Sequence, residues 1–414
     1  MMKSLAQVVS ARLEALGRIS DEPGQLTRLF CSPAMRRANC LVNSWMRQAG
    51  LATRRDAIGN LIGHYPAAPR KGKNEKTLLL GSHLDTVRNA GKFDGPLGVL
   101  TGIACIQRLH QEKVRLPFAV DVAAFGDEEG VRYHKAYLGS TALAGTFDKR
   151  DLKREDADGI SMAAAIRAFG GNPDAVATAR LNPARLLGYI EVHIEQGPLL
   201  ELKKVPVGVV TGISGQTRAQ LMFQGRAAHA GTTPMHLRRD ALCAAAQFIN
   251  EVESMARRRS GLVATVGAIN AFPGVSNVIP SQTRFTLDVR HNSDTMRRDA
   301  CAELRIRFNR IGALRKLQVD WQTVSETASV DCDPHLSTVL CQAVRQHQKA
   351  LVRLPSGAGH DAAALAAIIP VAMLFVRCKG GVSHHPNESA SQHDIGIAID
   401  VLGDFLQRLA DSYE

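Results

Sequence analysis

The sequence predicts an α/β domain with a mixed sheet, interrupted by a smaller α+β domain. The chain has 414 residues, more than one hydrophobic core usually organises, so we expect two domains. Over the first two hundred residues, apolar runs alternate with helical patterns, as they do in α/β domains. This alternation stops near Gly215 and resumes near Val330. We therefore predict one discontinuous domain over residues 1–213 and 330–414, and an inserted domain over residues 214–329.

Apolar spacing predicts the elements of the discontinuous domain in order. Between Leu5 and Leu16 apolar residues recur with helical spacing, which predicts an N-terminal helix. Continuous apolar runs predict buried strands at residues 76–81, 117–125 and 187–194. A helix should occupy residues 98–109, and after the insertion a helix at 336–348 and a strand at 371–376 complete the domain.

The inserted domain should place two helices on a mostly antiparallel sheet. An Ala-rich segment predicts a long helix at residues 240–258, and a second helix is expected at 295–311. Strands are expected at residues 216–223, 261–269 and 284–289.

Composition excludes several classes of protein. Hydrophobic residues make up 45% and charged residues 22% of the chain, as in a soluble globular protein. No apolar run approaches the roughly 20 residues of a membrane span, and the N-terminus lacks a signal-like apolar segment. The eight cysteines form no CxxC pair, which favours reduced thiols in a cytoplasmic protein. The net charge of +12 lacks aromatic interleaving, so we expect a solvated surface or steering of anionic substrates, and neither nucleic acid nor membrane as a partner.

Five short segments carry the residues of a metal site. They offer two carboxylates, three imidazoles and one spare glutamate, enough to hold two adjacent divalent ions and leave a general base. Mixed imidazole and carboxylate ligands suit zinc or manganese. The segments are His83-Leu84-Asp85, Phe93-Asp94-Gly95, Asp127-Glu128-Glu129-Gly130, His193-Ile194-Glu195-Gln196-Gly197 and Ser383-His384-His385-Pro386.

Candidate ligands follow at once after each of the predicted strands at residues 76–81, 117–125 and 187–194, and ligand sites of open α/β sheets lie beyond the carboxyl ends of strands. His83 and Asp85 are two residues apart, so in an extended chain the carboxylate can orient the imidazole. Glu129 and Glu128 can divide the work between metal ligand and proton shuttle. Spacing alone leaves open whether His384 or His385 binds metal, and taken singly each histidine is more often structural.

These residues, in this order, resemble the amidases of the hydantoinase/carbamoylase family, within the dinuclear aminoacylase and peptidase superfamily. The resemblance extends over essentially the whole chain, and HIEQGP is its most discriminating motif, because peptidase relatives commonly carry a carboxylate in place of His193. The other matching motifs are GSHLDTV, GKFDGPLGV, DEEGVRY, GRAAHAGTTPM, SNVIP, LDVRH, SGAGHDA and GVSHHPNES.

The resemblance implies a role for each residue of the site. It implies that His83, Asp94, Glu129, His193 and His384 bind two divalent ions, zinc or manganese with cobalt tolerated, and that Asp94 bridges them. Glu128 would be the catalytic base and Asp85 would brace His83. Gln196, His229, Asn277, Arg290 and His360 would contact substrate, with His229 also stabilising the developing oxyanion. The smaller domain would serve as lid and dimerisation domain of a homodimer.

The implied reaction is hydrolysis of a ureido group on a small carboxylate-bearing molecule, with release of ammonia and carbon dioxide. Allantoate is the substrate that we expect first. N-carbamoyl-L-amino acids and N-carbamoyl-β-alanine, the substrates of carbamoylases and β-ureidopropionases, are the alternative. An aminopeptidase or N-acyl deacylase would use the same metals but is disfavoured by His193 and Gln196. A non-catalytic binding protein would be expected to lack a ligand or Glu128, and none is missing.

Overall fold

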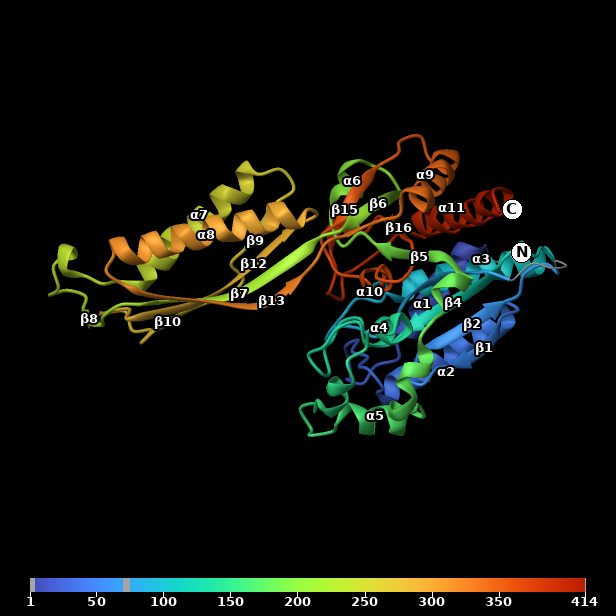
Figure 1. The fold of residues 1–414 in the computed structure, drawn as a ribbon, viewed down its shortest axis with the longest axis horizontal. Coiled ribbons are helices and arrows are strands. Elements are labelled where there is room, and N and C mark those ends of the chain that lie inside the picture. Colours follow the sequence, from blue (N-terminus) through green and yellow to red (C-terminus); the bar gives the residue numbers. More distant parts are fainter. Residues whose placement is uncertain (1–3, 70–74, 414) are drawn as a thin grey trace. The chain divides into compact units, whose positions relative to one another are not determined.

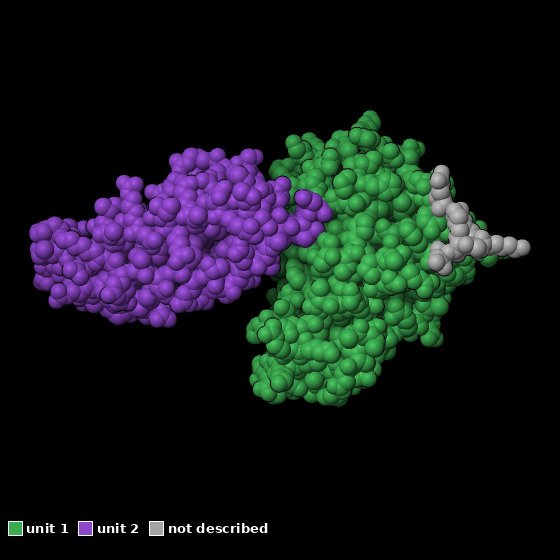
Figure 2. All heavy atoms as spheres, in the orientation of Figure 1, with its two compact units in different colours: residues 1–211, 332–414 green, residues 212–331 purple. Residues whose placement is uncertain are grey.

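The structure, a computed structural model, describes residues 4–69 and 75–413. It divides into two compact units: unit 1 comprises residues 1–211 and 332–414, and unit 2 comprises residues 212–331 (Figure 2). The sequence predicts boundaries two residues away from these. The mixed α/β fold is confirmed, because unit 1 is built on a mixed sheet. Within the described residues, no helix is long and apolar enough to cross a membrane.

The sheet of unit 1 has a parallel centre and antiparallel edges. Its order is β1-β2-β4-β3-β5-β16-β6-β14, with β15 paired to β6. Strands β4, β3, β5 and β16 run parallel, so their carboxyl ends meet at one edge. Strands β2 and β6 flank this centre in the antiparallel sense. The strands are β1 (Ala52–Arg55), β2 (Leu61–Tyr65), β3 (Thr77–His83), β4 (Ala119–Phe125), β5 (Leu186–Ile194), β6 (Val207–Ile213), β14 (Val330–Asp331), β15 (Arg353–Ser356) and β16 (Val371–Val376).

Helices cover this sheet and bury its apolar strands (Figure 1). Helix α3 packs on β3 and β5, while α9 and α11 pack on β16. Polar residues mark where helices begin: Ser4 caps α1 with a capping box, Asp333 caps α9, and Ser391 caps α11. The helices of unit 1 are α1 (Leu5–Gly17), α2 (Pro33–Gln48), α3 (Pro96–Gln111), α4 (Leu138–Ala144), α5 (Met162–Phe169), α6 (Leu199–Leu202), α9 (Pro334–His347), α10 (Asp361–Leu365) and α11 (Gln392–Asp411).

Unit 2 is an antiparallel sheet with two helices on one face. Strand β12 alternates strictly, with Phe285, Leu287 and Val289 buried and the residues between them more exposed, so one face of the strand meets the helices. The sheet order is β10-β12-β7-β13, with β9 on β12 and a separate β8–β11 pair. Its elements are β7 (Gly215–Gln224), β8 (Ala228–His229), α7 (Ala241–Arg258), β9 (Val263–Thr265), β10 (Ile269–Phe272), β11 (Val278–Ile279), β12 (Gln282–His291), α8 (Asp294–Leu314) and β13 (Gln318–Thr327).

Residues 261–269 do not form the single strand that the sequence predicts. Two short strands, β9 and β10, pair with β12 instead: Thr265 lies opposite Asp288 and Ile269 opposite Phe285. The outer chain therefore advances four residues while β12 advances three, which is the signature of a bulge. The main-chain N–H of Ala268 donates to Thr286 Oγ1 at 3.1 Å, so a side chain satisfies this donor beside the interruption.

The core of unit 2 should depend on Phe308 of α8. Its ring centre lies 4.3 Å from that of Phe223 and 5.2 Å from that of Phe248. We expect Phe308→Ala to lower the free energy of unfolding by about 3–5 kcal/mol, because it leaves a cavity among these rings. Ile306→Ala on the same helix removes a side chain that is 68% exposed and should cost less than about 0.5 kcal/mol. Urea denaturation would measure both, and equal losses would contradict this account.

Candidate metal centre

The parallel strands bring the predicted ligands to one edge of the sheet. His83 is the last residue of β3, and His193 is the penultimate residue of β5. Glu128 and Glu129 follow β4, and His384 lies in the loop after β16. These four strands are neighbours in the sheet, so their carboxyl ends bring together residues as distant in the sequence as His83 and His384.

Asp94 lies at the centre of this cluster, in the loop before α3. Its Oδ1 is 3.0 Å from His193 Nε2 and 3.6 Å from His83 Nε2. Its Oδ2 is 3.1 Å from His384 Nε2, which in turn lies 3.5 Å from Glu129 Oε1. The two carboxylate oxygens thus face two different groups of donors. One group contains His83 and His193, and the other contains His384 and Glu129.

The donor set fits two divalent ions that share Asp94. Two donors that each lie about 2.1 Å from one ion are roughly 3.0–3.4 Å apart at angles of about 90–110°. The separations of 3.0–3.6 Å around Asp94 are close to this range. Imidazole nitrogen and carboxylate oxygen are also the ligands that zinc and manganese accept. His384 rather than His385 faces Asp94, as the resemblance implies.

The buried carboxylates of the cluster would be stabilised by bound cations. Burial raises the pKa of Glu128 well above its usual range and raises the pKa of Glu129 to about 7. Burial also disfavours ionisation of Asp94, but hydrogen bonds from His193, His384 and His83 outweigh it and hold the pKa of Asp94 well below its usual range. Several carboxylates confined away from water are costly unless cations neutralise them.

Asp85 organises the acidic loop more directly than it braces His83. Its carboxylate accepts the main-chain N–H groups of Glu128 at 3.1 Å and Glu129 at 3.0 Å. The Nδ1 of His83 is 3.0 Å from the main-chain oxygen of Asp85 and 3.5 Å from its carboxylate. Asp85 therefore contacts His83 chiefly through its backbone, while its side chain fixes the segment that carries both glutamates.

Two other predicted residues lie at the cluster. The side-chain amide of Gln196 donates to Asp94 Oδ2 at 3.0 Å and to Ser383 Oγ at 3.2 Å. His360 is buried at the start of α10, where Ser356 Oγ lies 2.7 Å from its Nε2. Its ring centre lies 4.5 Å from that of His193, so it packs against a predicted ligand.

Left-handed backbone conformations concentrate around the cluster. Asp127, Gln196 and His384 have φ values of 63°, 57° and 56°, respectively, which cost side-chain-bearing residues energy and often occur at functional sites. Gly95 has φ 82°, and a Cβ there would lie 2.5 Å from the ring of His83. A glycine at that position is what allows the Asp94 loop to approach the histidine so closely.

Unit 2 holds the remaining predicted residues, and it keeps them apart. His229 and Asn277 meet at the β8–β11 pair, where the N–H of Ala230 donates to Asn277 at 2.9 Å, and both are exposed. This pair lies beyond the Gln282 end of β12, whereas Arg290 is near the other end, hydrogen-bonded to Asp288 at 2.9 and 3.0 Å. The strand from Gln282 to Arg290 spans roughly 26 Å, because each step from one residue to the next advances about 3.3 Å.

Sequence reasoning assigned no role to two buried glutamates of unit 1. Glu191 accepts the hydroxyl of Ser82 and the N–H of Ala362, both at 3.0 Å, and so links β3, β5 and α10. Its signal was a charged residue inside the apolar run of β5. Glu388 contacts the Asp94 loop. It lies within a motif of the resemblance, GVSHHPNES, but no spacing pointed to it.

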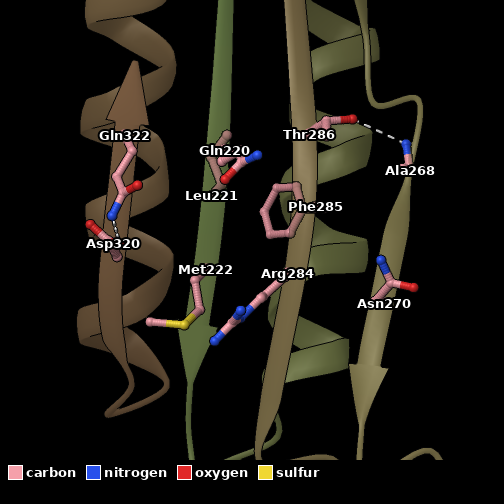
Figure 3. A pocket seen from close by; sticks show the side chains of 10 residues that line it. All are labelled: Gln220, Leu221, Met222, Ala268, Asn270, Arg284, Phe285, Thr286, Asp320 and Gln322. Atoms are coloured by element: carbon pink, nitrogen blue, oxygen red, sulfur yellow. Dashed lines mark hydrogen bonds between the residues drawn. The ribbon is translucent and has the colours of Figure 1, made fainter. Parts of the chain in front are cut away.

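A groove of about 1140 Å³ in unit 1 is lined in part by Glu129 and Gly130, and Glu129 is a predicted ligand. Its walls carry the guanidinium groups of Arg36, Arg37, Arg88 and Arg132. A cavity of about 420 Å³ on the sheet of unit 2 has a different character: its lining includes Arg284, Asp320 and Met222 but no histidine (Figure 3). Of these two, the groove of unit 1 is the one whose lining includes a predicted ligand.

Comparison with known proteins agrees with the motifs. A family model described as Peptidase family M20/M25/M40 matches residues 79–408. An N-carbamoyl-L-amino acid amidohydrolase from Geobacillus stearothermophilus is 41% identical over 96% of this chain and 97% of its own. An allantoate deiminase from Arabidopsis thaliana is 39% identical over 96% of this chain and 81% of its own.

Solved structures show the same fold. A hydantoinase/carbamoylase-family amidase from Burkholderia multivorans superposes with a TM-score of 0.91 at 31% identity, covering 97% of both chains. The predicted enzyme class, a hydrolase of carbon–nitrogen bonds, is confirmed by these relationships. The chain belongs to peptidase family M20/M25/M40, among relatives that are N-carbamoyl-amino-acid amidohydrolases, allantoate deiminases and hydantoinase/carbamoylase-family amidases.

Proposed function

We propose that this protein is a metal-dependent amidohydrolase that cleaves the ureido carbon–nitrogen bond of allantoate. Two contacts of Asp94 support ureido hydrolysis. His193, an imidazole where many peptidase relatives have a carboxylate, lies 3.0 Å from Asp94 Oδ1, and the amide of Gln196 donates to Asp94 Oδ2. An N-carbamoyl-L-amino acid or N-carbamoyl-β-alanine is the alternative substrate, supported by the similarity to an N-carbamoyl-L-amino acid amidohydrolase.

His83, His193 and Asp94 would hold one divalent ion, and Asp94, Glu129 and His384 the other. Zinc or manganese suits these donors, and cobalt is tolerated. Bound ions would supply Lewis-acid activation of water and of the scissile carbonyl.

The protein's own residues would then move the protons. Glu128 would take a proton from the attacking water as the oxygen bonds to the carbamoyl carbon, and would return it to the leaving nitrogen as that carbon–nitrogen bond breaks. Ammonia departs, and the carbamate that remains loses carbon dioxide. Burial away from water raises the pKa of Glu128, and the neighbouring carboxylate of Glu129 raises it further, towards the range that a proton shuttle needs.

Ammonia release would test the proposed activity. The protein reconstituted with Mn²⁺ should release ammonia from allantoate faster than from N-carbamoyl-β-alanine or any of a panel of N-carbamoyl-L-amino acids. Faster ammonia release from a carbamoyl amino acid would contradict the allantoate assignment and support the alternative substrate. No ammonia from any of these compounds would contradict ureido hydrolysis and favour an N-acyl deacylase or aminopeptidase.

Glu128→Gln should separate catalysis from metal binding. Its carboxylate is assigned as proton shuttle and not as ligand, so the variant should bind two ions per chain while kcat falls by about a hundredfold or more. Metal analysis and ammonia release measure the two properties. Glu129→Gln is the matched control, because it should lose metal as well as activity. Loss of metal from Glu128→Gln would show that Glu128 is a ligand.

Unit 2 would act as lid and dimerisation domain of a homodimer. Because roughly 26 Å separates the His229 and Arg290 ends of β12, one small substrate cannot contact both residues of the same chain. We assign Arg290 to the substrate carboxylate, which its planar fork suits. His229, as an oxyanion donor, and Asn277 of one protomer would then serve the site of the other.

Mixing two inactive variants would test this arrangement. Arg290→Ala and His229→Ala homodimers should each have little activity, with metal content unchanged. After subunit exchange, hybrid dimers would hold one intact site, so the mixture should recover about a quarter of the wild-type rate. A mixture that stays as inactive as its components would show that both residues serve the same chain's site or that neither serves any.

A further inference from the structure

We propose that Glu388 is a positioning residue that holds the Asp94 carboxylate and the His384 loop in one arrangement and thereby sets the affinity for divalent ions. The inference rests on the proposed assignment of Asp94 and His384 as metal ligands. It concerns a side chain that lies outside the donor groups themselves.

The contacts of Glu388 join two distant parts of the chain. Its Oε1 accepts the main-chain N–H groups of Phe93 at 2.8 Å and Asp94 at 3.0 Å. Its Oε2 accepts the hydroxyl of Ser383, the neighbour of His384, at 3.1 Å. Asp94 and Glu388 are 294 positions apart in the sequence. The Glu388 carboxylate therefore hydrogen-bonds both to the backbone of Asp94 and to the loop that carries His384.

Ser383 lies between two carboxylates. Its Oγ is 3.1 Å from Glu388 Oε2 and 3.2 Å from Asp94 Oδ2, but a hydroxyl has one proton to donate at a time. When Glu388 accepts that proton, Asp94 Oδ2 keeps more of its electron density for an ion. Without Glu388 the hydroxyl would turn to Asp94, and a hydrogen bond there competes with the metal.

The side chain of Glu388 is tightly packed. Its side chain is 3% exposed, and a Cβ added to Gly91 would lie 2.3 Å from its Cβ and 2.4 Å from its Oε1. The backbone at the start of the Asp94 loop therefore lies directly against this side chain. A shorter carboxylate could not reach Phe93, Asp94 and Ser383 from the same backbone position.

Glu195 provides a matched control. It is also a buried glutamate, and its carboxylate also accepts two main-chain N–H groups, those of Leu199 at 2.7 Å and Leu200 at 2.8 Å. It lies two residues from His193, but these two hydrogen bonds of its carboxylate go to the start of α6 and not to the Asp94 loop. Shortening it should perturb the start of α6 while the hydrogen bonds from Glu388 to the Asp94 loop stay in place.

The test compares Glu388→Asp with Glu195→Asp in the full-length, metal-free protein titrated with Co²⁺. Glu388→Asp keeps the charge but loses the reach, so its affinity for Co²⁺ should fall by about tenfold or more, as when partners of metal ligands are lost elsewhere. The visible absorption of the bound Co²⁺ should change with it. Glu195→Asp should keep its affinity within about threefold and its Co²⁺ spectrum unchanged, even if its melting temperature falls.

Wild-type affinity and spectrum in Glu388→Asp would overturn the proposal. So would weakened binding in Glu388→Gln alone, because charge and not position would then be the cause. If Glu388→Asp does not fold, Ser383→Ala decides: it should also change the Co²⁺ spectrum, and an unchanged spectrum and affinity would overturn the proposal. No substrate enters these measurements. Failure of the amidohydrolase assignment would appear separately, as wild-type protein that binds Co²⁺ but releases no ammonia.

Discussion

The carboxylate of Asp94 is buried between three imidazole rings, within 3.0–3.6 Å of a nitrogen of each. A carboxylate away from water is costly unless it is paired and hydrogen-bonded, and here it has both kinds of support. The imidazoles offer positive or dipolar partners to its oxygens, and Glu388 receives its main-chain N–H. Its two oxygens face two groups of donors, His83 with His193 and His384 with Glu129.

The architecture of unit 1 supplies this arrangement with few elements. Four adjacent parallel strands place a predicted ligand or the predicted catalytic glutamate at or beyond their carboxyl ends, so the sheet fixes the spacing between segments that are far apart in the sequence. The loops then turn sharply. Asp127, Gln196 and His384 adopt left-handed conformations, and Gly95 removes the side chain that would collide with His83. Hydrogen bonds from Asp85 and Glu388 to loop backbones hold these turns in place.

Unit 2 is organised by different constraints. Its sheet is antiparallel and its residues alternate, with aromatic side chains of three strands and two helices sharing one core. That regularity gives a long, stiff strand, β12. The strand separates Arg290 from the His229 and Asn277 pair by far more than the length of a small substrate. The distance follows from strand geometry alone, and it is the physical reason for assigning the two ends to different sites of the proposed dimer.

The sequence alone determined the elements whose patterns are strong and local. The apolar runs of β3, β4, β5 and β16 and the long helices α7 and α8 were predicted within a few residues, because burial imposes a clear period. The polar strands β1 and β13 were not assigned, and neither were the apolar strand β6 or the long helices α2 and α11. Residues 261–269 were predicted as one strand because a bulge leaves no mark on hydrophobicity. The motif residues and the family also followed from the sequence, since their types and order are distinctive.

Tertiary structure decided what depends on contacts across the chain. It brought His384 and not His385 to Asp94, a choice that spacing left open. It turned the side chain of Asp85 to the backbone of Glu128 and Glu129, and it seated Glu388 behind Asp94. It also placed Arg290 at the far end of a strand from His229. Local sequence cannot specify these relations, because each depends on how segments hundreds of residues apart pack against one sheet. The sequence therefore identifies the chemical groups that are available, and the fold determines which of them come into contact.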